Sequence, residues 1–157
     1  MKDNMDMEMR LIGKIMSSPR DYYDCHSLIS EEIFSDPLNR KIYKVVSERL
    51  DKGDKVDMII ISSAIKDPLV DLRVAECMSS DHYAYITKNM VLYLSQEDKK
   101  IRLKKLAELT TKKIDNGDDL FNVIEFVEEQ MKSISEVRGS DIPDIKKQLK
   151  ILHDDIR

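Results

Sequence analysis

The feature that most constrains this chain is its second half, where residues 81–138 contain no proline and a single glycine, Gly117. Neither residue type occurs between His82 and Asp115, so one helix can run through the whole interval. Unbroken, such a helix would be about 50 Å long, which is longer than a domain of this size can bury. We therefore expect two antiparallel helices that fold back at residues 116–118.

The residues at this fold have side chains suited to ending one helix and beginning another. Asn116 or Gly117 can adopt the left-handed conformation that closes the first helix. Asp118 or Asp119 can cap the second helix by accepting a hydrogen bond from its first turn. The turn is therefore predicted from local chemistry alone.

The second helix carries more apolar surface than one partner helix can cover. A regular stripe, suited to packing on the first helix, consists of Leu120, Ile124, Val127, Met131 and Ile134. Phe121, Val123 and Phe126 lie outside that stripe. Because a two-helix hairpin has only one inward face, we expect a second copy of the chain to cover the surplus. The predicted hairpin interface consists of Leu103, Leu106, Thr110, Phe121, Val123, Phe126, Val127 and Gln130.

The composition is typical of an all-helical protein. Charged residues make up 36% of the chain and aromatic residues 6%, with four glycines, four prolines and no tryptophan. At 157 residues the chain is long enough to form one domain with its own core. The expected fold class is all-α, with a compact globular head of about five or six helices. A protruding antiparallel helical hairpin and a C-terminal linker helix would follow the head.

Charge, cysteine content and hydropathy argue against several classes of protein. The formal net charge of −4 argues against a molecule that holds nucleic acid over its whole surface. Cys25 and Cys77 are far apart and form no CxxC pair, which is typical of a reduced protein. The polar start from Met1 to Asp6 does not resemble a signal peptide, and no apolar run approaches a membrane span. We expect a cytoplasmic protein without membrane association.

Capping residues and helix breakers predict the helices of the head. The first helix is expected over residues 6–17 and the second over residues 20–29, with Pro19 between them. Gly13 inside the first helix costs about 1 kcal/mol relative to alanine. This cost favours a close helix contact at Gly13, and a tolerated surface glycine is the alternative.

The clearest helix start is Asp36-Pro37, where Asp36 can serve as N-cap and Pro37 as first helical residue. This helix is expected to end at Gly53. Asp57 is expected to cap a short helix over residues 58–65, although its isoleucine run also suits a strand. We prefer the helix because no other segment could pair with a strand. A weaker helix is expected over residues 69–78.

The long helix is expected to divide between head and hairpin. Residues 85–94 are rich in apolar side chains that suit packing on the head, whereas residues 95–100 are polar throughout. We therefore treat residues 1–138 as one domain, with the head at about 5–95 and the hairpin at about 96–138.

Residues 139–157 are predicted to form a linker helix. Its apolar stripe consists of Ile145, Leu149, Leu152 and Ile156. A helix this short is marginal unless the stripe docks on something. The stripe would dock on a neighbouring subunit or on an absent domain, and the alternative is that it folds back on its own domain.

Four groups of residues occur in an order that matches a known pattern. They are Glu8, Leu11, Ile12, Gly13 and Pro19; Phe34, Pro37, Asn39, Arg40, Ile42 and Tyr43; Gly53, Val56, Asp57 and the run 58–61; and Tyr85. In order and spacing they resemble the N-terminal domain of the DnaB-type bacterial replicative DNA helicase, followed by its linker helix. Ile12 replaces the family's usual leucine and Asn39 its common histidine. Residues 67–70 depart from the Gly-Gly segment that the family commonly has there.

This resemblance implies an assembly and a set of partners. In the family, six N-terminal domains form a collar of three dimers above an ATPase ring, with hairpins pairing between subunits. The linker helix docks on the motor domain of the adjacent subunit. Primase or a helicase loader engages the collar, and the full-length ring holds DNA. ATP and Mg²⁺ bind in the motor domain, which this chain lacks.

The chain contains no phosphate-binding loop of the motor type. Such a loop reads Gly-x4-Gly-Lys-Ser/Thr, because backbone N–H groups and a lysine must neutralise phosphates. None of Gly13, Gly53, Gly117 and Gly139 begins one. We therefore expect no catalytic, cofactor or metal site in this chain, which would be a fragment or shortened relative of a longer motor protein.

Two other classes of function are weighed against the collar domain. In a stand-alone helical adaptor that binds nucleic acid or a helicase, Lys99, Lys100, Lys104 and Lys105 would be the DNA contacts. Acidic residues on the second hairpin helix offer complementary charge that explains these lysines without DNA. In a metal or thiol enzyme, the chemistry would need the chain's cysteines and histidines, whose spacing differs from that of zinc sites.

Overall fold

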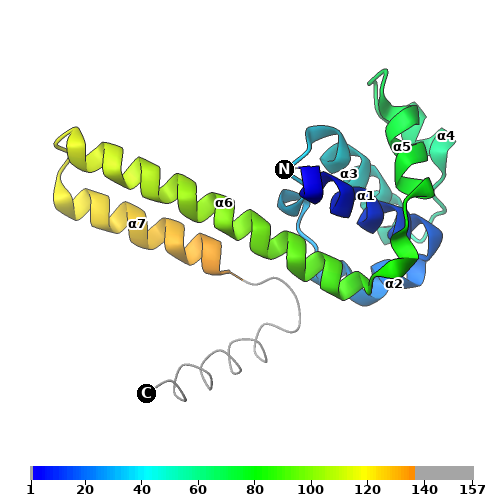
Figure 1. Cartoon of the computed structure of the whole chain (residues 1–157), viewed down its shortest axis with the longest axis horizontal. Coiled ribbons are helices and arrows are strands. Elements are labelled where there is room, and N and C mark those ends of the chain that lie inside the picture. Colours follow the sequence, from blue (N-terminus) through cyan, green and yellow to red (C-terminus); the bar gives the residue numbers. More distant parts are fainter. Residues whose placement is uncertain (1, 137–157) are drawn as a thin grey trace, which may run out of the picture. The chain divides into compact units, whose positions relative to one another are not determined.

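The computed structural model describes residues 2–136, with side chains from Asn4 onward, and is built of helices (Figure 1). The α-helices are α1 (Lys2–Ser17), α2 (Pro19–Cys25), α3 (Pro37–Asp51), α4 (Met58–Ala64), α5 (Val70–Ser79), α6 (Thr87–Asp115) and α7 (Leu120–Ser135). Short 3-10 turns are η1 (His26–Leu28), η2 (Glu31–Ile33) and η3 (His82–Ala84). Residues 2–136 contain no strand, so the all-α prediction is confirmed. The linker helix predicted for residues 139–157, with its docking residues Ile145, Leu149, Leu152 and Ile156, lies outside the described residues.

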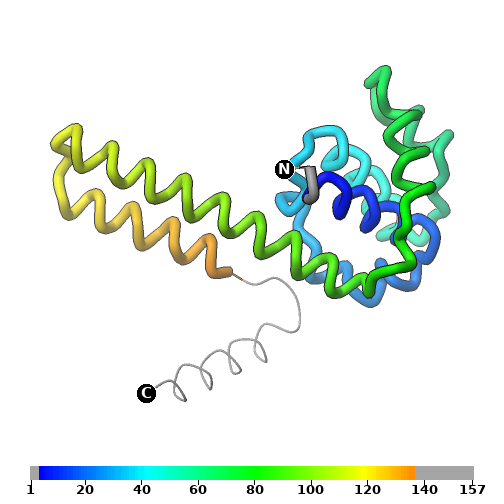
Figure 2. The backbone as a smooth tube through the Cα atoms, in the orientation of Figure 1, coloured from blue at the N-terminus to red at the C-terminus, as the bar shows by residue number. Residues whose placement is uncertain are grey.

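The chain forms two compact units that divide within α6, between Ile101 and Arg102. The first unit, here called the head, contains α1 to α5 and the first part of α6. The second, here called the hairpin, contains the rest of α6 and α7, which run antiparallel on either side of the turn at residues 116–119 (Figure 2). No helix in the described part of the chain is long and apolar enough to cross a membrane.

The helix starts in the head follow the predicted capping chemistry. Asp36 accepts a hydrogen bond from the backbone N–H of Asn39 at 2.9 Å, and Pro37 is the first residue of α3. Asp57 accepts one from the N–H of Ile60 at 2.9 Å, so the isoleucine run is helical, as predicted. Both caps occupy donors that the first turn of a helix leaves unpaired.

The turn of the hairpin also has the predicted residues in place. Gly117 has a φ of 79°, in the left-handed region that closes helices. Asp119 caps α7 by accepting a hydrogen bond from the N–H of Asn122 at 3.3 Å. Of the two cap candidates, Asp119 is therefore the one used.

The long helix starts later than predicted. The prediction placed its start near His82, but η3 and an extended Tyr85 precede α6, which begins at Thr87. Tertiary contacts hold the segment out of helical conformation. The His82 ring is buried with Nε2 3.1 Å from the Ser17 hydroxyl, and Lys14 donates to the Tyr85 carbonyl at 3.2 Å. Sequence periodicity contains no information about these contacts with α1.

One continuous apolar core fills the head. Its fully buried side chains include Leu11, Ile12, Ile15, Phe34, Ile42, Val46, Ile61, Val74 and Leu94. Phe34 and Tyr43 stack with ring centroids 4.5 Å apart. The core therefore receives side chains from α1, α3, α4, α5 and the start of α6, and it fixes these elements against one another.

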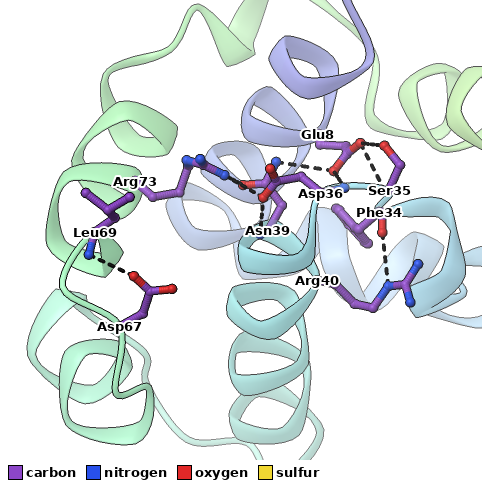
Figure 3. Close-up of polar contacts among 9 residues, drawn as sticks. All are labelled: Glu8, Phe34, Ser35, Asp36, Asn39, Arg40, Asp67, Leu69 and Arg73. Carbon is purple, nitrogen blue, oxygen red and sulfur yellow. Dashed lines mark hydrogen bonds and ion pairs between the residues drawn. The ribbon is translucent and has the colours of Figure 1, made fainter. Parts of the chain in front are cut away.

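A buried carboxylate connects α1 to the start of α3. Glu8 has no exposed surface, and Figure 3 shows its carboxylate facing the residues that precede and begin α3. It accepts hydrogen bonds from Ser35 N at 3.2 Å, Ser35 Oγ at 2.8 Å, Asp36 N at 3.3 Å and Asn39 Nδ2 at 3.2 Å. These donors offset the cost of taking an ionised group out of water. Glu8 therefore has a structural role in the head.

The network continues from α3 to α5 through Arg73. Its guanidinium donates to Asp36 Oδ1 at 2.6 Å and to Asn39 Oδ1 at 2.9 Å (Figure 3). Burial alone would raise the pKa of Asp36, but the N–H of Asn39 and the Arg73 guanidinium together hold that pKa below its usual value. The cap of α3 is therefore also an ion pair with α5.

Gly13 allows α1 to approach the end of α5. A Cβ atom at Gly13 would lie 2.1 Å from the Cys77 carbonyl oxygen and 3.1 Å from Nδ1 of His82. The nearest of these atoms belongs to backbone, which cannot move aside without shifting α5. The close-contact interpretation of Gly13 is therefore confirmed.

We predict that Gly13→Ala destabilises the head by about 2 kcal/mol despite alanine's better helix propensity, because overpacking outweighs the propensity gain. Denaturant unfolding measures the change. Gly117→Ala is the comparison, since its Cβ would meet no atom within 4 Å and only its positive φ is strained. A Gly13→Ala protein as stable as the wild type would contradict the close contact.

We predict that Asp36→Asn flattens the acid dependence of stability. The ionised Asp36 stabilises the fold above its unfolded pKa of about 3.9, and this contribution is lost as the pH falls through the lower folded pKa. Asparagine still caps a helix but lacks the charge that pairs with Arg73. Urea unfolding at pH values from about 6 down to about 3 measures the effect, which should exceed that of Asp118→Asn in the exposed turn. Equal pH profiles for the wild type and Asp36→Asn would contradict this role.

Candidate functional site

The inward side of the hairpin consists of few residues. Leu106 of α6 and Val123 and Ile134 of α7 are buried, and Thr110 and Val127 beside them are half-buried. The predicted stripe of α7 is therefore wrong in most of its members: Leu120, Ile124 and Met131 are exposed, although Ile134 is buried as expected. Val123, which we predicted to lie on the surplus surface, is only 4% exposed.

The exposed apolar side chains gather on one side of the hairpin. At about 100° per residue, Leu103, Ala107 and Ile114 lie about 60–100° around α6 from Leu106. Leu120, Ile124 and Met131 lie the same angles around α7 from Val123, in the same rotational sense. Because the two helices are antiparallel, equal rotations place both sets on the same side. We call these six residues the apolar face: Leu103, Ala107, Ile114, Leu120, Ile124 and Met131.

The opposite side of the hairpin is polar. The same count places Lys105 and Lys112 of α6 there, together with the exposed Leu109. Phe126 lies toward this side, and its ring is covered by Lys113, whose Nζ is 4.6 Å from the ring centroid. This cation–π contact shields the aromatic ring within the chain itself. The two sides therefore differ in kind, and only one offers a continuous apolar surface.

The structure separates the predicted interface residues into three groups. Leu106 and Val123 are buried inside the hairpin, and Thr110, Phe126 and Val127 are half-buried. Leu103, Phe121 and Gln130 are exposed, and Phe121 is the most exposed at 81%. Leu103 belongs to the apolar face. The sequence prediction assigned Leu120, Ile124 and Met131 of this face to the inward stripe of α7, whereas a wheel count from Val123 places them outside it.

The lysines proposed as DNA contacts do not share one side of α6. Lys99 is half-buried, and Lys100 pairs with Glu97 at 3.0 Å. Lys104 and Lys105 are exposed but adjacent in sequence, so they point about 100° apart. Helical geometry therefore does not combine the four into a single stripe along a DNA backbone.

The thiols of the chain are structural in character. Cys25 and Cys77 are both buried in the head core. Burial raises the pKa of Cys77 to about 12, so this thiol stays protonated and is a poor nucleophile at neutral pH. Within the described residues there is no group of three or more histidine, cysteine, aspartate or glutamate side chains arranged to hold a metal ion.

Comparison with known proteins identifies the head. A family model described as the DnaB-like helicase N-terminal domain matches residues 1–93, more than half of the chain. The chain belongs to this family, which confirms the predicted resemblance to its N-terminal domain. No curated protein matches the chain. The matched residues include Glu8 and Asp36, which belong to the buried polar network of the head, and Gly13, which allows the close approach of α1 to α5.

We predict that Val123→Ala destabilises the hairpin by about 1–2 kcal/mol, because it removes buried methyl groups, whereas Phe121→Ala leaves hairpin stability nearly unchanged. Hydrogen exchange of the α7 amides, measured in dilute protein, reports this stability locally. The sequence pattern placed Val123 and Phe121 on the same outer surface, whereas the structure buries Val123 and exposes Phe121. The two variants therefore distinguish the predicted arrangement from the observed one. A larger loss of protection for Phe121→Ala would contradict the inward side described here.

Proposed function

We propose that this chain is the collar domain of a hexameric replicative DNA helicase, and that it mediates subunit association in DNA replication. The family supports the helicase context, and the apolar face of the hairpin is the observation that carries the role in association. A second copy would cover this face, with dimers building to a hexamer.

The hairpin leaves several large apolar side chains uncovered on one side. Leu120 and Ile124 are each more than half exposed, and Leu103, Ile114 and Met131 nearly so, all on one side of a two-helix hairpin. Contiguous apolar surface of this kind on a small domain marks an interface, whereas isolated exposed residues do not. Such a face can pair with its own copy, since two hairpins related by a two-fold axis form a four-helix bundle.

The remaining parts of the proposal come from the family context. Primase or a helicase loader would dock on the assembled collar, and DNA would be held by the full ring. ATP and Mg²⁺ would bind in a separate motor domain, and residues 139–157 would connect to it as a linker helix. Such a protein would work in the cytoplasm. The four lysines proposed as DNA contacts do not form one stripe, so the adaptor that binds nucleic acid through the hairpin is not favoured.

We predict that Ile124→Glu prevents self-association, because it introduces a charge at the centre of the face that would be buried. Sedimentation velocity over a range of protein concentrations measures the effect. The control is Leu109→Glu, which makes the same kind of change at a similarly exposed residue (46% against 54%) on the opposite side. Leu109→Glu should associate like the wild type. Equal loss in both variants, or a wild type that stays monomeric at high concentration, would contradict the proposal.

A further inference from the structure

The segment after the hairpin, residues 139–157, is here called the tail and lies outside the described residues. Its sequence contains an apolar stripe whose first and last members, Ile145 and Ile156, are 11 residues apart. The apolar face of the hairpin has the same extent on each helix, over residues 103–114 of α6 and 120–131 of α7. As a helix, the stripe would be about 17 Å long and would match the face along its length.

The connection between α7 and the tail determines the direction in which a tail helix would run. α7 ends at Ser135, and Pro143 suits the first turn of the next helix. Residues 136–142 are left for the connection, a length that usually joins antiparallel neighbours. A tail helix beside the hairpin would therefore run antiparallel to α7 and parallel to α6. The polar side of the hairpin carries Lys105 and Lys112, so the apolar face is the side that suits the stripe.

Charged residues of opposite sign lie at the two outer edges of the apolar face. Glu128 lies about 140° around α7 from the inward Val123. Lys104 lies about 160° around α6 from the inward Leu106. Both charged side chains are exposed, and each lies just beyond the apolar residues of its own helix. The edge that α7 provides is therefore acidic at this point, and the edge that α6 provides is basic.

The tail also carries charges of opposite sign on the two flanks of its stripe. Counted from the middle of the stripe, Lys146 and Lys150 lie about 90–130° around the helix in one rotational sense. Asp144 and Asp155 lie about 90–110° around in the other sense. Because α-helices are right-handed, a tail antiparallel to α7 turns its basic flank toward α7 and its acidic flank toward α6.

The charges of the tail therefore complement those of the hairpin in this orientation. Lys150 would face Glu128, and Asp144 would face Lys104. A tail helix running the other way would place its basic flank beside Lys104, where like charges repel. The length of the connection and the charge pattern thus select the same orientation independently.

We propose that the tail folds back on the apolar face as a third helix and competes there with a second copy of the chain. This inference rests on the proposed role of the face in association and adds a control on it. A segment joined by a short connection has an effective concentration of about 1 mM, so the closed form dominates in dilute protein. Association prevails at high protein concentration, or when the tail is bound elsewhere as a linker helix.

Hydrogen exchange of the tail amides in the dilute full chain tests the position of the tail. These amides should be protected in the wild type, because a docked helix exchanges slowly. Ile124→Glu places a charge under the stripe and should lower this protection at least about tenfold. Leu109→Glu, on the opposite side of the hairpin, should leave it unchanged. Equal protection of the tail in the two variants would overturn the proposal.

Sedimentation velocity tests the competition. Leu152→Glu lies in the stripe and should tighten self-association at least about tenfold, because the closed form no longer competes in either copy. Ile151→Glu makes the same kind of change about 130° from the middle of the stripe, and it should change the affinity less than about twofold. In a chain that associates, equal affinities of the two variants would overturn the competition. Weaker association of Leu152→Glu would do the same, since the tail would then bridge copies.

Exchanging the charges of one expected pair tests the orientation of the tail. Lys150→Glu or Glu128→Lys alone should lower the protection of the tail amides about twofold to threefold. The double variant should restore that protection, because the pair is re-formed with its signs reversed. A double variant protected no better than the single ones would overturn the antiparallel placement.

The two kinds of measurement separate this inference from the proposed function. Absence of association in both the wild type and Leu152→Glu would contradict the proposed function, while exchange of the tail amides would still decide where the tail lies. Association of a wild type whose tail amides have no protection in dilute protein would overturn the inference alone.

Discussion

The head depends on one carboxylate that has no contact with water. Glu8 lies inside the packing of α1 on α3, where an ionised group is tolerated only if hydrogen-bond donors surround it. The donors come from Ser35, Asp36 and Asn39, so α1 can pack only if the chain entering α3 has one particular conformation. Through Arg73 the same constraint reaches α5.

This constraint explains which parts of the head could be predicted from sequence. Asp36 and Asp57 each accept a hydrogen bond from the backbone N–H three residues later, so their role as caps can be predicted from local spacing. The partners of Glu8 lie between 27 and 31 residues further along the chain, and no periodicity indicates such a pairing. Gly13 is an intermediate case. A glycine inside a helix lowers helix stability, which indicates a close contact, but the sequence does not show that the neighbour is Cys77.

The hairpin shows the same limit for apolar residues. The two helices and the turn at Gly117 were predicted, because glycine and aspartate have local conformational roles there. The inward side of α7 was not predicted, because apolar residues cover more than half of its circumference and several regular stripes can be drawn. Only packing against Leu106 of α6 selects the stripe that contains Val123 and leaves Ile124 exposed.

The head and the hairpin therefore contribute differently to function. The head packs one continuous apolar core, although Ile59, Leu69 and Leu72 remain more than half exposed on its surface. The hairpin exposes apolar side chains along one whole side. On the other side, Lys113 covers the ring of Phe126 and partly shields it from solvent. A surface that the hairpin cannot cover by itself is the physical reason for expecting a second copy there.

Intermolecular NMR contacts between copies would show directly whether a second chain covers the apolar face. In a sample that mixes methyl-labelled chains with unlabelled chains, filtered NOE spectra report only contacts across an interface. We predict contacts from the methyl groups of Leu103, Leu120 and Ile124 and none from Leu109. Contacts that involve Leu109 instead, or no contacts at high protein concentration, would contradict it.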